Sequence, residues 1–341
     1  MNYLNIIQGS ISTILPVAIY TLFGALLAKY KFLDAECNKS LAGAFSKVLF
    51  PIFLFGKVGK TFYSSAITEV AIYFTPVFSI AVGSVIAYLN SILIKSRAKF
   101  THMCLISFYN AGTPPLLLVR GACSGYGALS ESSYCKDAEG YVSISIMINN
   151  LIVWTYAYWL IQLDIRSENR EFRFDLKSLL GPVPLACYMG ICVGLMPKVS
   201  SQLFESSGIL FSVVDSMQMI GEAGIIVSQI MLGSYLMLTD RQGREKGTLV
   251  IDTLIIKLII FPVLGLVYVY LFDQFSFFSD NDVLKFVCFL CFASPSPLLI
   301  LIINQNLNTN TSITSYYLFW IYLFSPFSLF AHTCLFYYLY I

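Results

Sequence analysis

Residues 110–119 read Asn110-Ala-Gly-Thr-Pro-Pro-Leu-Leu-Leu-Val119, so two adjacent prolines stand inside an apolar run of about residues 101–120. Residues 292–301 read Phe292-Ala-Ser-Pro-Ser-Pro-Leu-Leu-Ile-Leu301 and repeat the same order, with small polar residues and prolines before an aliphatic run. A proline in a helix interior removes a hydrogen bond and clashes with the preceding turn, at a cost of about 3 kcal/mol. We therefore expect two apolar helices that each break near the middle.

The composition around these two segments is that of a membrane protein. Of the 341 residues, 57% are hydrophobic and only 12% are charged, and the mean hydropathy is +0.74. Soluble domains carry about 25% charged residues, and apolar blocks of ~20 residues are long enough to cross a bilayer. The sequence therefore predicts an all-α polytopic protein embedded in a lipid bilayer. A net charge of +2 without a basic tract predicts no nucleic-acid partner.

We predict ten transmembrane helices, at approximately residues 8–28, 40–58, 69–94, 101–120, 141–163, 178–197, 209–237, 248–271, 284–306 and 312–340. Connectors after odd-numbered spans are rich in basic residues, namely Lys29, Lys31, Lys39, Lys95, Arg97, Lys99, Arg166, Arg170, Arg173, Lys177, Arg241, Arg244 and Lys246. The other connectors, with their helix ends, hold only Lys57, Lys60, Arg120, Lys136, Lys198 and Lys285. Because basic connectors remain in the cytosol, both termini are predicted to be non-cytosolic.

The charged connector from Asp164 to Lys177 divides the chain into two predicted units, residues 1–165 and 166–341, with five spans in each. Because five is odd, the second unit enters the membrane inverted relative to the first, as in many secondary transporters. Trp154-Thr-Tyr156 in span five also has a counterpart in span ten, Trp320-Ile-Tyr322. The predicted fold is therefore ten helices as two inverted five-helix repeats, with broken crossover helices in spans four and nine.

The two breaks form the predicted substrate site. Thr113 and Ser296 each precede a proline, as an N-cap does at a new helix start. A half-helix N-terminus carries unpaired amides and a partial positive charge, which lipid cannot satisfy. If the breaks cross, they form a site for a small anion, whereas the alternative is a pair of structural kinks. The candidate substrate-binding residues are Asn110, Thr113, Pro114, Pro115, Ser294, Ser296, Pro297 and Gln305.

Ionisable residues inside the apolar spans are candidates for coupling, because a charge in a bilayer is costly unless it is paired or wet. Asp215 and Glu222 are seven residues apart and so share one helical face. Lys47 and Lys257 lie in other spans. We take Asp215, Glu222 and Lys257 as the coupling candidates, with simple solvation at the membrane interface as the alternative for Asp215.

No catalytic constellation is visible in the sequence. The two histidines, His102 and His332, lie far apart in the chain and supply neither a metal site nor a catalytic triad. Cys288 and Cys291 lie in an apolar run and are interpreted as buried thiols. We expect no enzyme activity, no cofactor and no metal.

Several motifs together resemble the auxin efflux carrier superfamily, and its PIN-likes branch most closely. They are Thr113-Pro-Pro-Leu-Leu-Leu-Val119, Cys123, Cys135, Trp154-Thr-Tyr-Ala-Tyr158, Gly221-Glu-Ala-Gly-Ile225 and Ala293-Ser-Pro-Ser-Pro297, spread over nearly the whole chain. The resemblance implies a scaffold made of the first two spans of each repeat and a transport domain made of the other six. It also implies a substrate held where spans four and nine cross, a disulfide between Cys123 and Cys135, and assembly as a homodimer.

The resemblance further implies small organic anions as substrates, such as indole-3-acetate. It places chains with a short central connector in the endoplasmic reticulum and long-loop carriers at the plasma membrane. The chain has Thr113 and Leu299 where the family often has asparagine, which leaves backbone amides as the main expected anion ligands. We predict an elevator-like secondary transporter of small carboxylates in one of these two membranes. The alternatives are a sodium-coupled organic-anion symporter and a receptor that binds its ligand without moving it.

Overall fold

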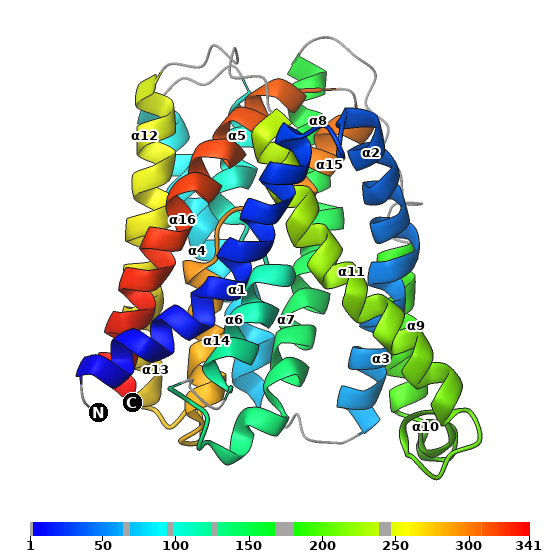
Figure 1. The fold of residues 1–341 in the computed structure, drawn as a ribbon. Coiled ribbons are helices and arrows are strands. Elements are labelled where there is room, and N and C mark those ends of the chain that lie inside the picture. The colour runs from blue at the N-terminus through cyan, green and yellow to red at the C-terminus, as the bar shows by residue number, and fades with distance from the viewer. Residues whose placement is uncertain are drawn as a thin grey trace.

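The computed structural model describes residues 3–63, 69–93, 98–124, 128–167, 181–238, 247–307 and 309–341. Within these residues every regular element is a helix (Figure 1). The physical reason is that a backbone surrounded by lipid must satisfy its hydrogen bonds within its own segment. The expectation of an all-helical protein is confirmed.

The first half of the chain contains two uninterrupted helices, α1 (Tyr3–Lys29) and α4 (Val70–Leu93). Between them, α2 (Ala35–Ala44) continues through a π-helical turn, η1 (Phe45–Leu49), into α3 (Phe50–Tyr63). The remaining elements are α5 (Lys99–Ser107), α6 (Thr113–Ala122), the 3-10 turn η2 (Ser133–Lys136), α7 (Ala138–Ile152), the π-helical turn η3 (Val153–Ala157) and α8 (Tyr158–Ser167).

The second half contains the long helices α11 (Phe211–Leu238) and α16 (Thr311–Tyr340). The remaining elements are α9 (Pro182–Gly194), α10 (Pro197–Phe204), α12 (Gly247–Ile255), the π-helical turn η5 (Ile256–Ile260), α13 (Phe261–Asp273), α14 (Asp282–Ala293) and α15 (Leu299–Asn306). The start of α1 and the end of α16 lie at the same end of the molecule (Figure 1).

Several of these helices have the length and composition of membrane spans. Six pass this test among the described residues: Ala35–Tyr63, Val70–Leu93, Ala138–Ile165, Phe211–Leu238, Leu249–Asp273 and Thr311–Tyr340. The pair α9 and α10, bent by 109°, makes a seventh if it is one span. The four helices α5, α6, α14 and α15 are each too short, because each is half of an interrupted apolar run. The protein is an integral multi-pass membrane protein, and each of the ten predicted ranges overlaps a helix or an interrupted pair.

Close contacts at glycines join α1, α3, α9 and α11 into one unit, which we call the first bundle. A Cβ at Gly24 of α1 would collide with the carbonyl oxygen of Ile230 in α11. A Cβ at Gly194 of α9 would lie 2.7 Å from the carbonyl oxygen of Gly59 in α3. Because only glycine allows backbones to come this close, these helices are packed as a rigid group.

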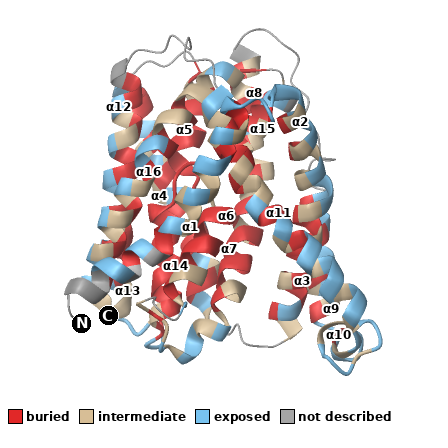
Figure 2. Cartoon of the chain, viewed as in Figure 1, coloured by how far each residue is buried: buried red, intermediate tan, exposed pale blue. Residues whose placement is uncertain are grey.

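The second bundle consists of α4, α5, α7, α13, α14 and α16, with α6 attached to it through α5. A Cβ at Gly83 of α4 would lie 2.8 Å from the Ser107 backbone at the end of α5. The Ser79 hydroxyl of α4 donates to the carbonyl of Cys291 in α14 at 2.9 Å. Figure 2 shows burial concentrated in the centre of this bundle, where every residue of α14 from Val283 to Ala293 is buried. The helix α6 also lies against α1, at the seam between the bundles.

Candidate substrate site at the helix crossover

The two predicted breaks lie against each other. Residues 108–112 interrupt the run between α5 and α6, and residues 294–298 interrupt the run between α14 and α15. The amide of Asn110 donates to the carbonyl of Pro295 at 2.6 Å. The Ser296 hydroxyl donates to the carbonyl of Leu105 at the end of α5. The two breaks, far apart in the sequence, therefore form one crossover.

Tyr322 of α16 forms hydrogen bonds with both breaks of the crossover. Its buried hydroxyl accepts a hydrogen bond from the Asn110 side-chain amide at 2.6 Å and donates to the Ser296 carbonyl at 2.8 Å. The Asn110 side-chain oxygen accepts the amide of Gly112 at 3.1 Å. These contacts satisfy backbone and side-chain groups that a helix interruption in a membrane would otherwise leave unpaired.

Lys257 binds the carbonyl groups at the C-terminal end of α5. It comes from η5, is fully buried, and its Nζ donates to the carbonyls of Phe108 at 2.7 Å and Ile106 at 3.2 Å. Its ammonium also lies 4.6 Å from the ring centroid of Phe261. A cation at a helix C-terminus compensates the negative end of the helix dipole. This predicted coupling residue thus contacts the crossover directly.

The structure places the helix starts differently from the sequence expectation. The N-cap of α6 is Gly112 rather than Thr113, and the Thr113 hydroxyl instead pairs with the Ser228 hydroxyl of α11 at 2.5 Å. The N-cap of α15 is Leu298, two residues beyond the predicted Ser296. Both N-cap predictions were wrong because each hydroxyl bonds a partner outside its own helix start.

The prolines also limit what the half-helix ends can offer an anion. Pro114 and Pro115 stand in the first turn of α6, and neither has a backbone N–H. The amide of Leu116 already donates to the Gly112 carbonyl at 3.4 Å. The residues that break the helix therefore also remove donors from its N-terminus.

A cavity of about 280 Å³ lies beside the crossover. Both breaks contribute to its wall, together with η1, α7, η3, α9 and α11. Uncharged polar side chains are supplied by Ser46, Asn110, Thr113, Asn149, Asn150, Ser228 and Gln229, and apart from Lys47 the other described lining residues are mainly apolar. This volume is at the lower end of the range typical of small-molecule sites.

Among the described residues that line this cavity, Lys47 is the single charged side chain. It lies in η1 and is exposed, and within the described residues no hydrogen bond or ion pair joins it to another group. The sequence identified Lys47 as a charge inside an apolar span but not as a site residue. An isolated lysine in an otherwise apolar segment was the signal available.

The predicted site residues fall into three groups in the structure. Asn110, Thr113 and Pro297 line the cavity. Pro114, Pro115, Ser294 and Ser296 are buried at the crossover but are not part of the cavity wall. Gln305 is exposed near the end of α15, away from the wall.

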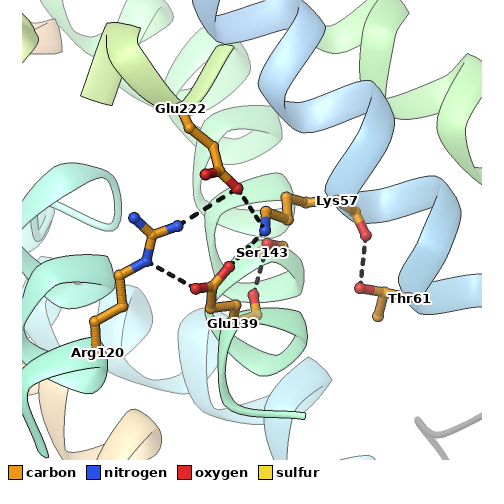
Figure 3. A network of polar contacts seen from close by, with 6 residues as sticks. All are labelled: Lys57, Thr61, Arg120, Glu139, Ser143 and Glu222. Atoms are coloured by element: carbon orange, nitrogen blue, oxygen red, sulfur yellow. Dashed lines mark hydrogen bonds and ion pairs between the residues drawn. The ribbon is translucent and has the colours of Figure 1, made fainter. Parts of the chain in front are cut away.

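A second polar feature, drawn in Figure 3, joins α3, α6, α7 and α11. Lys57 pairs with Glu139 at 2.6 Å and with Glu222 at 2.9 Å. Arg120 pairs with Glu139 at 2.7 Å and with Glu222 at 3.6 Å. We call these four residues the charge quartet. Glu222, a predicted coupling residue, is thus held by two cations.

Two further predicted residues lie outside the crossover. Asp215, in the first turns of α11, is exposed. Cys123 and Cys135 form a disulfide, the pairing that the resemblance implied, and it closes the connection between α6 and η2.

These observations define a multi-pass helical membrane protein with two crossed, interrupted helices beside a small cavity. The family model described as membrane transport protein matches residues 10–332, so the chain belongs to this family, which is that of the auxin efflux carriers. The chain is 20% identical to PIN-LIKES 7 of Arabidopsis thaliana, over 96% of this chain and 97% of that protein. It is 21% identical to PIN-LIKES 1 of the same plant, over 94% of this chain and 77% of that protein.

Proposed function

We propose that the protein is a secondary transporter of small organic anions, in particular monocarboxylates, and that the cavity beside the crossover holds the substrate. Membership of a membrane transport family supports transport rather than catalysis. The crossed breaks supply polar backbone in the membrane interior, where irregular backbone is tolerated only beside protein or a wet cavity.

The observation that carries the choice of an anion is the charge of the cavity wall. Lys47 provides one positive charge, and among the described residues that line the cavity there is no Asp, Glu, Arg or His. An ammonium with no protein partner pairs favourably with a carboxylate that leaves water. With few free amides at the start of α6, Lys47 is the strongest available partner for the substrate's charge.

The proposed cycle moves the second bundle against the first, in an elevator-like manner. The wall of the cavity combines both bundles, since η1, α9 and α11 face the two breaks across it. A shift between the bundles would therefore close the cavity on one side and open it on the other. The close glycine contacts within each bundle support movement of each as a unit.

The ten-span arrangement as two inverted repeats, residues 1–165 and 166–341, is part of the same proposal. In both halves an interrupted run comes fourth and a long run comes fifth, which supports the repeat. We also propose that both termini are non-cytosolic and that the membrane is the endoplasmic reticulum or the plasma membrane. A homodimer is the proposed assembly.

The proposal is tested by flux of radiolabelled small organic acids, indole-3-acetate included, into proteoliposomes held at a defined membrane potential. We expect saturable, potential-dependent flux of at least one acid by the unmodified protein. In Lys47→Gln the apparent affinity for that acid should fall at least about tenfold, because a charge-assisted contact of 1.5–3 kcal/mol is lost. Lys60→Gln is the matched control, since Lys60 is exposed and does not line the cavity.

The same assay separates the alternatives. A strict requirement for sodium on the substrate side would favour the symporter. Binding of an acid to folded protein without any flux would favour a receptor. Equal affinity in the Lys47→Gln and Lys60→Gln variants would contradict the assignment of Lys47.

A further inference from the structure

The charge quartet lies on one side of the cavity. Arg120 follows Thr113 by seven residues in α6, and Lys57 follows Phe50 by seven residues in α3, a distance of ~10 Å along each helix. Glu222 precedes the cavity residue Ser228 by six residues in α11, or ~9 Å. The four charged side chains meet one another (Figure 3), so the quartet lies beyond one end of the cavity, between helices that line it.

Each bundle contributes one cation and one anion to the quartet. The first bundle supplies Lys57 of α3 and Glu222 of α11, and these two pair with each other at 2.9 Å. The second supplies Arg120 of α6 and Glu139 of α7, which pair at 2.7 Å. Two further contacts cross the seam, Lys57 to Glu139 at 2.6 Å and Arg120 to Glu222 at 3.6 Å.

With the charges distributed in this way, the pair in the first bundle can move away from the pair in the second bundle at a low energetic cost. Separation of a half-buried ion pair normally leaves each charge without a partner, which is the costly part of breaking it. Here each half keeps its own pair and is neutral by itself, so separation loses only the two contacts that cross the seam. The side chains are 20–35% exposed, so water already reaches them.

We propose that the charge quartet is a releasable gate between the two bundles, closed in this structure on the side to which the charge distribution of the connectors assigns the non-cytosolic face. This gate rests on the proposed movement of the bundles. Its opening separates the pair Lys57 and Glu222 from the pair Arg120 and Glu139, while both pairs stay intact.

Charge exchange within a bundle tests the gate. The double variant Arg120→Glu with Glu139→Arg keeps the pair inside the second bundle but brings like charges together across the seam. The mirror variant, Lys57→Glu with Glu222→Lys, does the same from the first bundle. Combining all four substitutions restores opposite charges at every one of the four contacts.

The separation is measured as the distance distribution between two spin labels, placed as noncanonical residues at Lys60 and Lys136 so that the native cysteines remain. Both positions are exposed; Lys60 lies in α3 of the first bundle, and Lys136 ends η2, two residues before the start of α7 in the second bundle. We expect each double variant to add a longer distance to the distribution, and the fourfold variant to return it to that of the unmodified protein.

Two results would overturn the gate. One is an unmodified distribution in a folded double variant, and the other is a fourfold variant that keeps the longer distance. If the first double variant does not fold, the mirror variant carries the same test. The measurement needs no substrate, so absence of anion flux would count against the proposed function and not against the gate.

Discussion

The π-helical turns η1 and η5 each place one lysine inside an apolar helix, and the two lysines have opposite surroundings. Lys257 in η5 is fully buried, with its ammonium bonded to two carbonyls at the end of α5. Lys47 in η1 is exposed and lines the cavity, with no hydrogen-bond or ion-pair partner in the part of the chain that the structure describes. Neither forms an ion pair among the described residues. One lysine is therefore part of the structure, while the other remains available for a ligand.

The difference shows how the same local feature serves two purposes. A π-helical turn inserts an extra residue into a helix and redirects the side chains around it, which is why such turns are frequent at functional sites. In η5 the redirected lysine meets the broken end of α5, whose last carbonyls lack helical partners. In η1 the redirected lysine meets a cavity between two bundles instead.

The largest expected effect is a loss of stability when Lys257 is replaced, compared with little or no loss when Lys47 is replaced. Lys257→Met leaves the carbonyls of Ile106 and Phe108 without their donor, and we expect a loss of about 1–2 kcal/mol in stability. The loss stays this small because methionine also removes the cost of burying an ammonium. The measurement is thermal unfolding in detergent.

Lys47→Met is the matched control for that experiment. Since Lys47 is exposed and forms no hydrogen bond or ion pair within the described residues, its replacement should change stability by no more than about 0.5 kcal/mol. Equal unfolding temperatures for the two variants would contradict a structural role for Lys257.

A smaller effect is expected at the crossover that Lys257 supports. Tyr322→Phe removes one acceptor and one donor, the contacts with Asn110 and Ser296, at a cost of about 1 kcal/mol. Because the change loosens the breaks without altering the charge of the cavity, the maximal rate of flux should fall more than the affinity. The check is a concentration series of the transported acid, and an effect on affinity alone would show that Tyr322 acts on the cavity instead.

The smallest effect is expected at Gln305, which the sequence placed in the substrate site. Because Gln305 is exposed and away from the cavity wall, Gln305→Ala should leave both flux and affinity within about twofold of the unmodified protein. Thr113→Val serves as the comparison, since Thr113 lines the cavity. A larger loss of flux or affinity in Gln305→Ala than in Thr113→Val would show that Gln305 belongs to the substrate site after all.

Much of the fold was predictable, because its causes are local. The low charge and long apolar runs imply a membrane protein of helices, and the prolines at 114, 115, 295 and 297 imply interruptions where the structure has them. The N-caps were predicted incorrectly. Thr113 and Ser296 have N-cap sequences, yet their hydroxyls bond Ser228 and Leu105 from other helices. Such partners are invisible to rules that consider one helix at a time.

The sequence by itself determined that the chain is helical, lies in a membrane and interrupts two helices, because composition and proline act within a few residues. Only the tertiary structure decided that the interruptions touch, that Lys257 is buried while Lys47 faces a cavity, and that Glu222 joins three other charges. The Lys257 contact to Phe108, for example, spans 149 positions of the chain. A side chain's partner across such a distance depends on how whole helices pack, and no local pattern encodes it.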